Sequence, residues 1–596
     1  SATVSDYWVG PVVATRTRPG LDPVPAQLVR TVGTRTATAI TSTVPKTWRS
    51  TRTETSYDTT SGLVTAAYDH GDLTRPEQAT CTTTSYTAPN TALNLVNLVA
   101  ATQVVALPCA GSGVNGLSAP VTVTPDDVIS RTRTFYDTPT FDTTWPQPAP
   151  TVGDINVTQR STTGAAGALV YLTTGTSSFD GYGRPVGSTD ANGNSSTVAY
   201  TMANGLTTGV VSTDPLGHAV TTTLEPVRGL TVRAVDANNR ETVLAHDALG
   251  RLTSLWEPGR PTTATASQRF RYQVSQTTPS TITTETLADH GSYRTEVTFY
   301  DALTRTRQTQ TQTPNDKRLV TDTFYDTRGW AYKTNNAYYN AESAPTTTMV
   351  DMVGRDQLIS NQTQVTFDGT GRTVLATALD KGQVRSQTRT IHGGDRTTVL
   401  PPAGGTPTTT FVDALDRTVE LDSYRTPPTV SGSVVTGGDP VKIVYGYDRR
   451  GNQASTTDDH GNTWTSGYDL LGRVVARHDP DAGDSATSYD NLGNVLSTTS
   501  AAGLVSYAYD ALGRRTARFD GDTTTTPVST WTYDSTTIGN GIGQLATSTS
   551  RVGSDVYTTK INGYSRQGQP LGSTVTIPSS LANGALARDD TVTNTY

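Results

Sequence analysis

Cysteine, methionine and charged residues are scarce in this 596-residue sequence. It contains 2 Cys and 3 Met, and charged residues make up 17% of the chain, against a usual level of about 25%. Counted with Gly and without Tyr, the apolar fraction is about 38%, where globular domains typically reach 45–50%. A solid hydrophobic core of ordinary proportions is therefore not expected. Thr and Ser fill the gap, which is typical of β-strands that carry Thr on a wet face.

Several classes of function lack their usual signals. No apolar run approaches the ~18 residues that span a bilayer, so no membrane span is expected. The net charge of −7 gives no reason to expect a nucleic-acid partner. The sequence has no GxSxG, HExxH, Walker or dinucleotide-binding motif. We therefore predict no catalytic residue, no metal site and no cofactor, and we do not expect an enzyme.

The two cysteines, Cys81 and Cys109, flank the stretch TAPNTALNLVNLVAA, for which we expect a short helix capped at Asn90. No His lies between them and they form no CxxC, so they are a poor metal site. Two interpretations stay open for them. They form a disulfide that closes the loop, or they are two small buried apolar side chains.

A short motif, Tyr-Asp-x-x-Gly-Arg, recurs through the chain. It reads YDALGR from Tyr509, YDLLGR from Tyr468, YDALTR from Tyr300 and HDALGR from His246. It alternates with a second turn of the form DxxGN, as in DDHGN from Asp458. In the C-terminal part the turn positions fall 10 or 11 residues apart, at Asp448, Asp458, Asp469, Asp479, Asp490, Ser500, Asp510 and Asp520. The full repeat is therefore 20 to 21 residues and carries two turns.

Each motif is interpreted as a corner where the chain reverses. The Asp side chain is expected to cap the turn with about one hydrogen bond, and Gly takes the left-handed conformation at the end of the turn. The two residues between them are permissive. Tyr is expected to stack on the Tyr of the neighbouring hairpin, and Arg to lie near the Asp or a Tyr face. The residues assigned to these structural corners are Tyr447, Asp448, Gly451, Tyr468, Asp469, Gly472, Arg473, Tyr489, Asp490, Gly493, Tyr509, Asp510, Gly513 and Arg514.

The residues between the corners alternate in the manner of strands. In VKIVYGYD, which begins at Val441, apolar side chains recur at every second position. Strands of about seven residues between corners predict consecutive antiparallel hairpins. An open sheet of more than about ten strands curls, splits or closes. Because a Thr-rich inner face cannot form a dry interior, we predict an all-β antiparallel meander that spirals into a wide, hollow shell.

The repeats also suggest how the chain is divided. Residues 1–150 hold the motif faintly and are predicted to be an N-terminal β-rich segment with degenerate repeats, ending at WPQPAP from Trp145. Residues 151–596 are predicted to be the repeat shell, with lengthened loops between 260 and 440. The chain begins without Met, and Tyr596 looks like the Tyr of a further corner. We therefore expect a piece of a longer protein, in which the shell continues.

The YDALGR and YDLLGR corners, the DxxGN turns and the 20 to 21 spacing resemble the RHS/YD-repeat family. Its members include bacterial RHS polymorphic toxins, the C component of Tc toxins, wall-associated proteins and teneurins. The resemblance implies a hollow cocoon that houses or delivers a C-terminal toxic effector, which would be this chain's own partner. It also implies a protein that is secreted or on the bacterial cell surface. The family's self-cleaving core segment would lie after Tyr596, so no protease role is assigned.

Two alternatives remain beside the shell. A cell-surface or wall-associated adhesion module would bind a glycan or receptor through aromatic side chains such as Trp256, Trp330 and Trp464. A β-rich carbohydrate-active enzyme would use a pair of carboxylates, and Asp is abundant because it marks the turns. Nothing in the sequence selects one pair of carboxylates over another.

Overall fold

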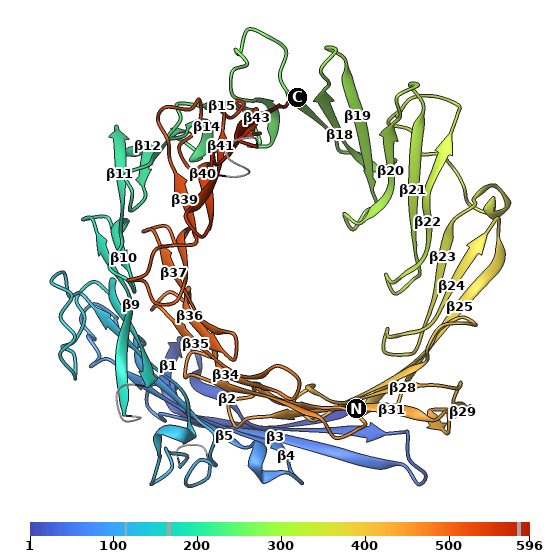
Figure 1. The fold of residues 1–596 in the computed structure, drawn as a ribbon. Coiled ribbons are helices and arrows are strands. Elements are labelled where there is room, and N and C mark those ends of the chain that lie inside the picture. Colours follow the sequence, from blue (N-terminus) through green and yellow to red (C-terminus); the bar gives the residue numbers. More distant parts are fainter. Residues whose placement is uncertain (114–115, 164–167, 581–585, 596) are drawn as a thin grey trace. The chain divides into compact units, whose positions relative to one another are not determined.

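The protein is built almost entirely of antiparallel β-strands. The computed structural model describes residues 1–113, 116–163, 168–580 and 586–595, so Tyr596 lies outside the described residues. Within them, 41 strands belong to one antiparallel sheet, and a short separate hairpin is made of two more. Strands that follow one another in the chain pair side by side (Figure 1). The predicted all-β antiparallel meander is confirmed.

The strands follow one another in four runs along the chain. The first run contains β1 (Ala2–Arg18), β2 (Leu21–Ile40), β3 (Thr47–Tyr57), β4 (Val64–Asp72), β5 (Thr80–Tyr86), β6 (Val99–Val105), β7 (Val128–Tyr136), β8 (Ile155–Thr163), β9 (Leu169–Phe179), β10 (Pro185–Asp190) and β11 (Ser195–Ala203). The second run contains β12 (Leu206–Thr213), β13 (Ala219–Glu225), β14 (Leu230–Val235), β15 (Glu241–His246), β16 (Leu252–Trp256), β17 (Gln268–Gln273), β18 (Ser280–Leu287), β19 (Tyr293–Tyr300), β20 (Thr306–Gln312), β21 (Arg318–Tyr325), β22 (Ala331–Asn340), β23 (Gln362–Phe367), β24 (Thr373–Asp380) and β25 (Gln383–His392).

The third run contains β26 (Arg396–Leu400), β27 (Thr408–Val412), β28 (Thr418–Tyr424), the separate hairpin of β29 (Thr429–Ser431) and β30 (Val434–Thr436), β31 (Pro440–Tyr447), β32 (Gln453–Thr457), β33 (Thr463–Tyr468), β34 (Val474–Asp479), β35 (Gly483–Tyr489), β36 (Val495–Ser500), β37 (Gly503–Tyr509) and β38 (Arg515–Asp520). The fourth run contains β39 (Ser529–Tyr533), β40 (Leu545–Val552), β41 (Asp555–Ile561), β42 (Gly572–Ile577) and β43 (Arg588–Thr593). Short 3-10 helices lie at η1 (Pro76–Gln78), η2 (Pro125–Asp127) and η4 (Asp356–Leu358).

The chain divides into two compact units, each made of several segments. Unit 1 contains Ser1–Thr197, His392–Thr398 and Thr408–Pro527, and unit 2 contains Val198–Ile391, Val399–Pro407 and Val528–Tyr596. Each unit therefore combines an early and a late part of the chain. The functional boundary near residue 150, with segments 1–150 and 151–596, stays a prediction.

The corners share one backbone geometry, which Asp448 illustrates. The Gly451 N–H donates to the Asp448 carbonyl at 3.0 Å, and the Asp448 N–H donates to the Asn452 carbonyl at 2.9 Å. Gly451 has φ +86°, in the left-handed region. This is a type I turn closed by a left-handed glycine, a common hairpin connection whose extra residue makes a bulge. The pairing register shifts between Gly446 and Tyr447, directly before the corner.

The same shift recurs before the Tyr of later corners, between Gly467 and Tyr468, Ser488 and Tyr489, and Ala508 and Tyr509. A bulge bends the strand and increases its twist. The bulges repeat every two strands in this part of the chain, so each corner motif brings a bend of the strand with it. Two other turns of the same series are tighter, since Asp479 pairs with Gly483 and Ser500 with Gly503.

Among the residues that the structure describes, buried apolar side chains form small clusters instead of one large core. In unit 1 a cluster gathers around the two cysteines and includes Ala66, Val105 and Val128. In unit 2 a cluster contains Ile538, Ala546 and Tyr564. Many side chains buried elsewhere are polar, so hydrogen bonds must replace part of the missing apolar packing.

The segment between the cysteines differs from the sequence prediction. A short helix was expected after Asn90. The structure instead has a turn in which Asn90 and Leu95 pair as an isolated antiparallel bridge. The Asn90 side chain does cap this turn, because its Oδ1 accepts the Leu93 N–H at 3.2 Å, but the cap serves a reversal and not a helix.

The left-handed glycines give a direct test of the corner geometry. Gly472 has φ +78°, and a Cβ there would meet only Asn452 Oδ1, at 3.7 Å. The conformation, not lack of space, therefore excludes a β-branched side chain. We expect Gly472→Val to destabilise unit 1 by about 2–3 kcal/mol, measured by thermal unfolding. Gly467→Ala in the preceding strand is the control, because a Cβ there would make an ordinary 3.5 Å contact with Ala476. Equal melting of Gly472→Val and the parent protein would contradict the corner model.

Candidate functional site

The corner aspartate accepts several hydrogen bonds at once. Asp510 Oδ1 accepts the backbone N–H groups of Leu512 at 2.9 Å and Arg514 at 3.0 Å, and its Oδ2 accepts the Arg514 Nε–H at 2.7 Å. Asp469 makes the same three bonds, to Leu471 and to Arg473. The expectation of about one capping bond for each Asp was therefore too low, because Oδ2 is also paired.

Asn replaces Arg in the corners at Asp448 and Asp490. Asn452 Nδ2 lies 3.0 Å from Asp448 Oδ2, and Asn494 Nδ2 lies 2.8 Å from Asp490 Oδ2. The left-handed glycines of these and the two Arg corners are Gly451, Gly472, Gly493 and Gly513, with φ between +73° and +94°. The YDxxGR and DxxGN turns are thus two versions of one structure, in which the last residue supplies a donor to the carboxylate.

In the corners at Asp180 and Asp458 the surroundings favour the charged form of the carboxyl group. The pKa of Asp180 is lowered chiefly by the hydrogen bond from the Arg184 side chain, and that of Asp458 chiefly by the bond from the Asn462 side chain. Backbone N–H donors add to both effects. A carboxylate that accepts several donors is stabilised as the anion.

The corner tyrosines form hydrogen bonds that join the end of each strand to the strand beside it. The hydroxyl groups of Tyr447, Tyr468, Tyr489 and Tyr509 donate to the carbonyls of Thr418, Gln453, Val474 and Val495, at 2.7–2.9 Å. Each acceptor is the first residue of the neighbouring strand. The guanidinium of Arg473 lies 4.8 Å from the Tyr489 ring centre, so the ring packs on an arginine of the preceding corner. Arg473 thus lies near both an Asp and a tyrosine face, as expected for the corner arginine, whereas the hydroxyl of Tyr489 contacts a carbonyl that was not foreseen.

The middle residues of some corners, interpreted from the sequence as permissive, bind segments far away in the chain. In unit 1, Asn192 Nδ2 donates to Asp490 Oδ2 at 2.9 Å, and Asn491 Nδ2 donates to the Ala191 carbonyl at 3.1 Å. These pairs are 298 and 300 residues apart.

Further links of this kind are found in both units. In unit 1, Arg449 Nη1 lies 2.7 Å from Asp127 Oδ1. In unit 2, Asn238 and Ile542, which are 304 residues apart, exchange two hydrogen bonds of 2.8 Å. The middle positions therefore join early and late strands within each unit. A local motif cannot reveal this role, because the partner lies about 300 residues away.

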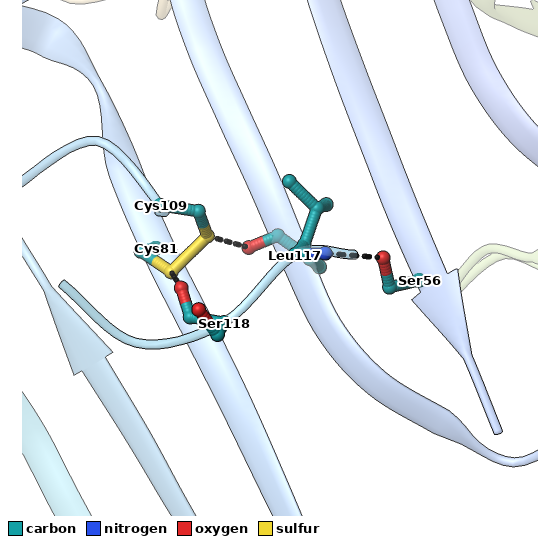
Figure 2. The surroundings of a disulfide bond; sticks show 6 residues. Ser56, Cys81, Cys109, Leu117 and Ser118 are labelled. Carbon is teal, nitrogen blue, oxygen red and sulfur yellow. Dashed lines mark hydrogen bonds between the residues drawn. A yellow bond between two sulfur atoms is a disulfide. The ribbon is translucent and has the colours of Figure 1, made fainter. Parts of the chain in front are cut away.

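Cys81 and Cys109 form a disulfide bond, with Cα atoms 4.9 Å apart. Figure 2 shows it beside Leu117 and Ser118, in a segment that the Ser56 hydroxyl also holds by accepting the Leu117 N–H at 3.0 Å. Cys81 is 1% exposed and Cys109 is 8% exposed, within the apolar cluster of unit 1. The bond pins the irregular segment after β6 against β5.

Histidines occupy corner positions as donors. His218 holds the place of the corner Arg or Asn, because its N–H donates to Asp214 Oδ1 and its Nδ1 lies 2.9 Å from Asp214 Oδ2. Asp458, Asp459 and His460 place ligand atoms within 4.8 Å of one another. Both oxygens of Asp458 already accept hydrogen bonds within the turn, from His460, Asn462 and the Asn462 side chain. We interpret these groups as parts of turns and not as metal ligands.

The three tryptophans considered as stacking platforms are half-buried. Trp256 Nε1 donates to the Ala264 carbonyl at 3.0 Å, and the Trp330 ring lies 5.3 Å from the Phe367 ring. Two of these rings thus contact the protein itself. No helix within the described ranges is long and apolar enough to cross a membrane.

A buried carboxyl, which the sequence analysis did not single out, lies on β28 of unit 1. Asp422 is 4% exposed, and its Oδ1 accepts no hydrogen bond within the described residues. Lys442, opposite it on β31, lies 3.9 Å away and is closer to Glu420, at 2.6 Å. Burial, together with the neighbouring Glu420, raises the pKa of Asp422 to about 6.

The model of the RHS repeat matches residues 447–484 and 489–525 of this chain. No curated protein sequence matches it significantly. Among solved structures, the crystal structure of TcdB2-TccC3 superimposes with a TM-score of 0.75 at 14% identity, over 99% of this chain and 35% of that one. The same complex without its hypervariable C-terminal region gives a TM-score of 0.76 at 14% identity, over 100% of this chain and 38% of that one.

A third solved structure, the Tc holotoxin pore of Photorhabdus luminescens, gives a TM-score of 0.73 at 14% identity, over 95% of this chain and 36% of that one. The chain therefore spans little more than a third of the solved chains that it matches. At such identities the likeness shows the fold. The two matched RHS repeats coincide with the corners from Asp448 to Asp510, where the geometry is most regular.

The number of hydrogen bonds that a corner side chain makes predicts how much its removal lowers the free energy of unfolding. Asp510→Ala removes three hydrogen bonds, one of them to a charged donor, whereas Tyr509→Phe removes one. We expect Asp510→Ala to cost about 2–3 kcal/mol and Tyr509→Phe about 1 kcal/mol in thermal unfolding. If the two substitutions cost the same, the carboxylate does not organise the corner.

The raised pKa of Asp422 predicts how stability depends on pH. Because the folded pKa lies above the unfolded value of ~3.9, the charged form penalises the folded state. The penalty is absent below about pH 4 and complete above about pH 6. Asp422→Asn, which mimics the neutral form, should therefore stabilise unit 1 by roughly 1–3 kcal/mol at pH 8 and have little effect at pH 4. Thermal melts at both pH values measure this, with the exposed Asp481→Asn as control. A gain that is equal at the two pH values would contradict the assignment.

Proposed function

Since the chain is an RHS-repeat protein, we propose that it forms part of a structural shell that houses or delivers a C-terminal effector. In this proposal the segment performs no catalysis, and its partner is the effector region of its own protein. The observation that carries the proposal is the likeness to TcdB2-TccC3, which extends over 99% of this chain with a TM-score of 0.75.

The corner chemistry supports a role in forming a wall. Hydrogen-bonded corners fix the strand ends, and links about 300 residues apart in the chain join strands within each unit. Such a sheet is stable without a dry interior, which leaves a polar face free to line an enclosed space. The hypervariable C-terminal region named for one matched complex supports the idea of a variable cargo after a constant wall.

We further propose that the protein acts outside the cytosol, secreted or on the bacterial cell surface. The buried Cys81–Cys109 disulfide supports this location, since such bonds persist in oxidising compartments and are rare in the cytosol.

Protease protection in the complete natural protein tests the shell. We expect the region after residue 596 to resist a broad-specificity protease in the parent protein. In a Gly472→Val variant, which weakens one corner, the same region should be digested at least tenfold faster. Gly467→Ala is the matched control and should protect as the parent does.

Two results would overturn the proposal. One is a complete protein in which the region after residue 596 is absent or is digested equally in all three proteins. The other is specific glycan binding that Trp464→Ala abolishes, because it would favour the adhesion module.

A further inference from the structure

Segment 341–361, between β22 and β23 of unit 2, crosses a polar face of the sheet. We call residues 344–351 of this segment the strap. Most side chains of the segment point to solvent, including those of Thr346 and Thr348, whereas Val350 and Ile359 are buried. Within the strap itself, Ala344, Pro345 and Met349 are half-buried and Val350 is buried, so apolar packing and polar contacts both attach it to the sheet.

Two glutamine side chains on β20 hold the strap by its backbone. Gln308 Nε2 donates to the Val350 carbonyl at 2.8 Å, and Gln308 Oε1 accepts the Val350 N–H at 2.9 Å. Gln310 Nε2 donates to the Thr348 carbonyl at 2.9 Å, and Gln310 Oε1 accepts the Thr346 N–H at 3.0 Å. The pattern imitates a β-ladder, with side-chain amides in place of a neighbouring strand.

Each amide keeps its other donor and acceptor for the sheet. Gln308 Nε2 also donates to Asp322 Oδ1 at 2.6 Å, and Gln310 Nε2 donates to Gln308 Oε1 at 2.7 Å. Arg318 Nη1 donates to Gln310 Oε1 at 2.9 Å. These bonds involve no atom of the strap, so they orient both amides whether or not the strap is in place.

The carboxylate of Asp322 is fixed in turn by two further donors. Asn335 Nδ2 and the Tyr338 hydroxyl each lie 3.0 Å from Asp322 Oδ2. Burial, and then the charge of Asp322, raises the pKa of Tyr338, which therefore stays protonated and donates. Gln308, Gln310 and Asn335 are all 0% exposed, so the amides form a rigid, preorganised set.

We propose that the Gln308–Gln310 face is a binding site for an extended polypeptide strand, which the strap occupies in the observed structure. All four amide contacts go to backbone atoms, so the amides bind the N–H and C=O groups of alternate residues. Two side chains of the strap add to this binding, because Arg318 Nη1 donates to Thr346 Oγ1 at 3.3 Å and Val350 is buried. The ligand is any unfolded segment in β conformation. The face is available when the strap opens locally, which is easier for a segment that belongs to no strand of the sheet.

Peptides added to a protein with a released strap test this site. Thr346→Pro with Val350→Pro removes the two strap N–H donors and leaves the two glutamines intact. We expect this variant to bind an acetylated, amidated peptide of residues 344–351, and to bind within about threefold a scrambled version that keeps Pro345, Thr346 and Val350 in place. The same peptide with Pro at the positions of Thr346 and Val350 should bind at least tenfold more weakly. Fluorescence anisotropy with labelled peptides gives these affinities.

Two further variants, each made in the Thr346→Pro, Val350→Pro protein, distinguish binding at the Gln308–Gln310 face from non-specific adsorption. Gln308→Ala with Gln310→Ala should abolish peptide binding. Gln364→Ala, at an exposed glutamine of β23, should leave binding unchanged. A scrambled peptide that fails to bind, or binding that survives loss of both buried glutamines, would overturn the proposal.

Hydrogen exchange in the unaltered protein provides a second measurement, which does not depend on folding of a variant. The N–H groups of Thr346 and Val350 should exchange at least a hundredfold faster than those of β21, because the strap opens alone. Exchange of the strap only together with β21 would overturn the proposal. These results are independent of the proposed shell function. A protein that encloses no effector would still bind the peptide, and a protein that encloses an effector would still do so without the Gln308–Gln310 site.

Discussion

The corner carboxylate is the interaction on which the rest of the structure depends. In most antiparallel sheets one buried apolar face fixes the strand register, because a slip of one residue would turn that face to water. Here Thr and other polar side chains occupy both faces of many strands, so a slip would cost little burial. In corners such as that of Asp469, the Asp replaces that constraint by binding two backbone N–H groups and one side-chain donor at fixed positions. The register is therefore set at the strand ends.

The corners and the spacing of the strands were predictable because they depend on neighbours in the chain. Asp, Gly and the following Arg or Asn lie within five residues, and the turn they form follows from their own conformational preferences. What the sequence analysis missed depends on distant partners. Asn238 looks like an ordinary turn residue until Ile542, 304 residues later, is placed beside it. The amide pair of Gln308 and Gln310 was missed for a similar reason. Two Gln in a Thr-rich strand are typical of a solvent-exposed face, and only the distant segment 341–361 buries them.

Polar burial is the second consequence of a sheet whose described residues form only small apolar clusters. A buried amide or carboxylate is costly unless its hydrogen bonds are satisfied, and satisfied networks are rigid. The network around Asp322 meets this condition, because both of its oxygens and both neighbouring glutamine amides have partners. Asp422 does not, because one oxygen accepts no bond among the described residues and the nearest cation prefers Glu420. Burial, together with the neighbouring Glu420, raises the pKa of Asp422 to about 6.

The composition of the sheet bears on the proposed binding of an extended polypeptide. Apolar walls bind exposed apolar side chains tightly and with little discrimination, which would hinder both release and refolding of a cargo. A polar sheet avoids this, but paired strands offer few free backbone groups, because the ladder uses them. Side-chain amides are a way to present additional N–H and C=O groups from within a complete ladder. The Gln308–Gln310 pair does so for Thr346, Thr348 and Val350 of the strap, and in our proposal another extended segment binds through the same weak backbone bonds.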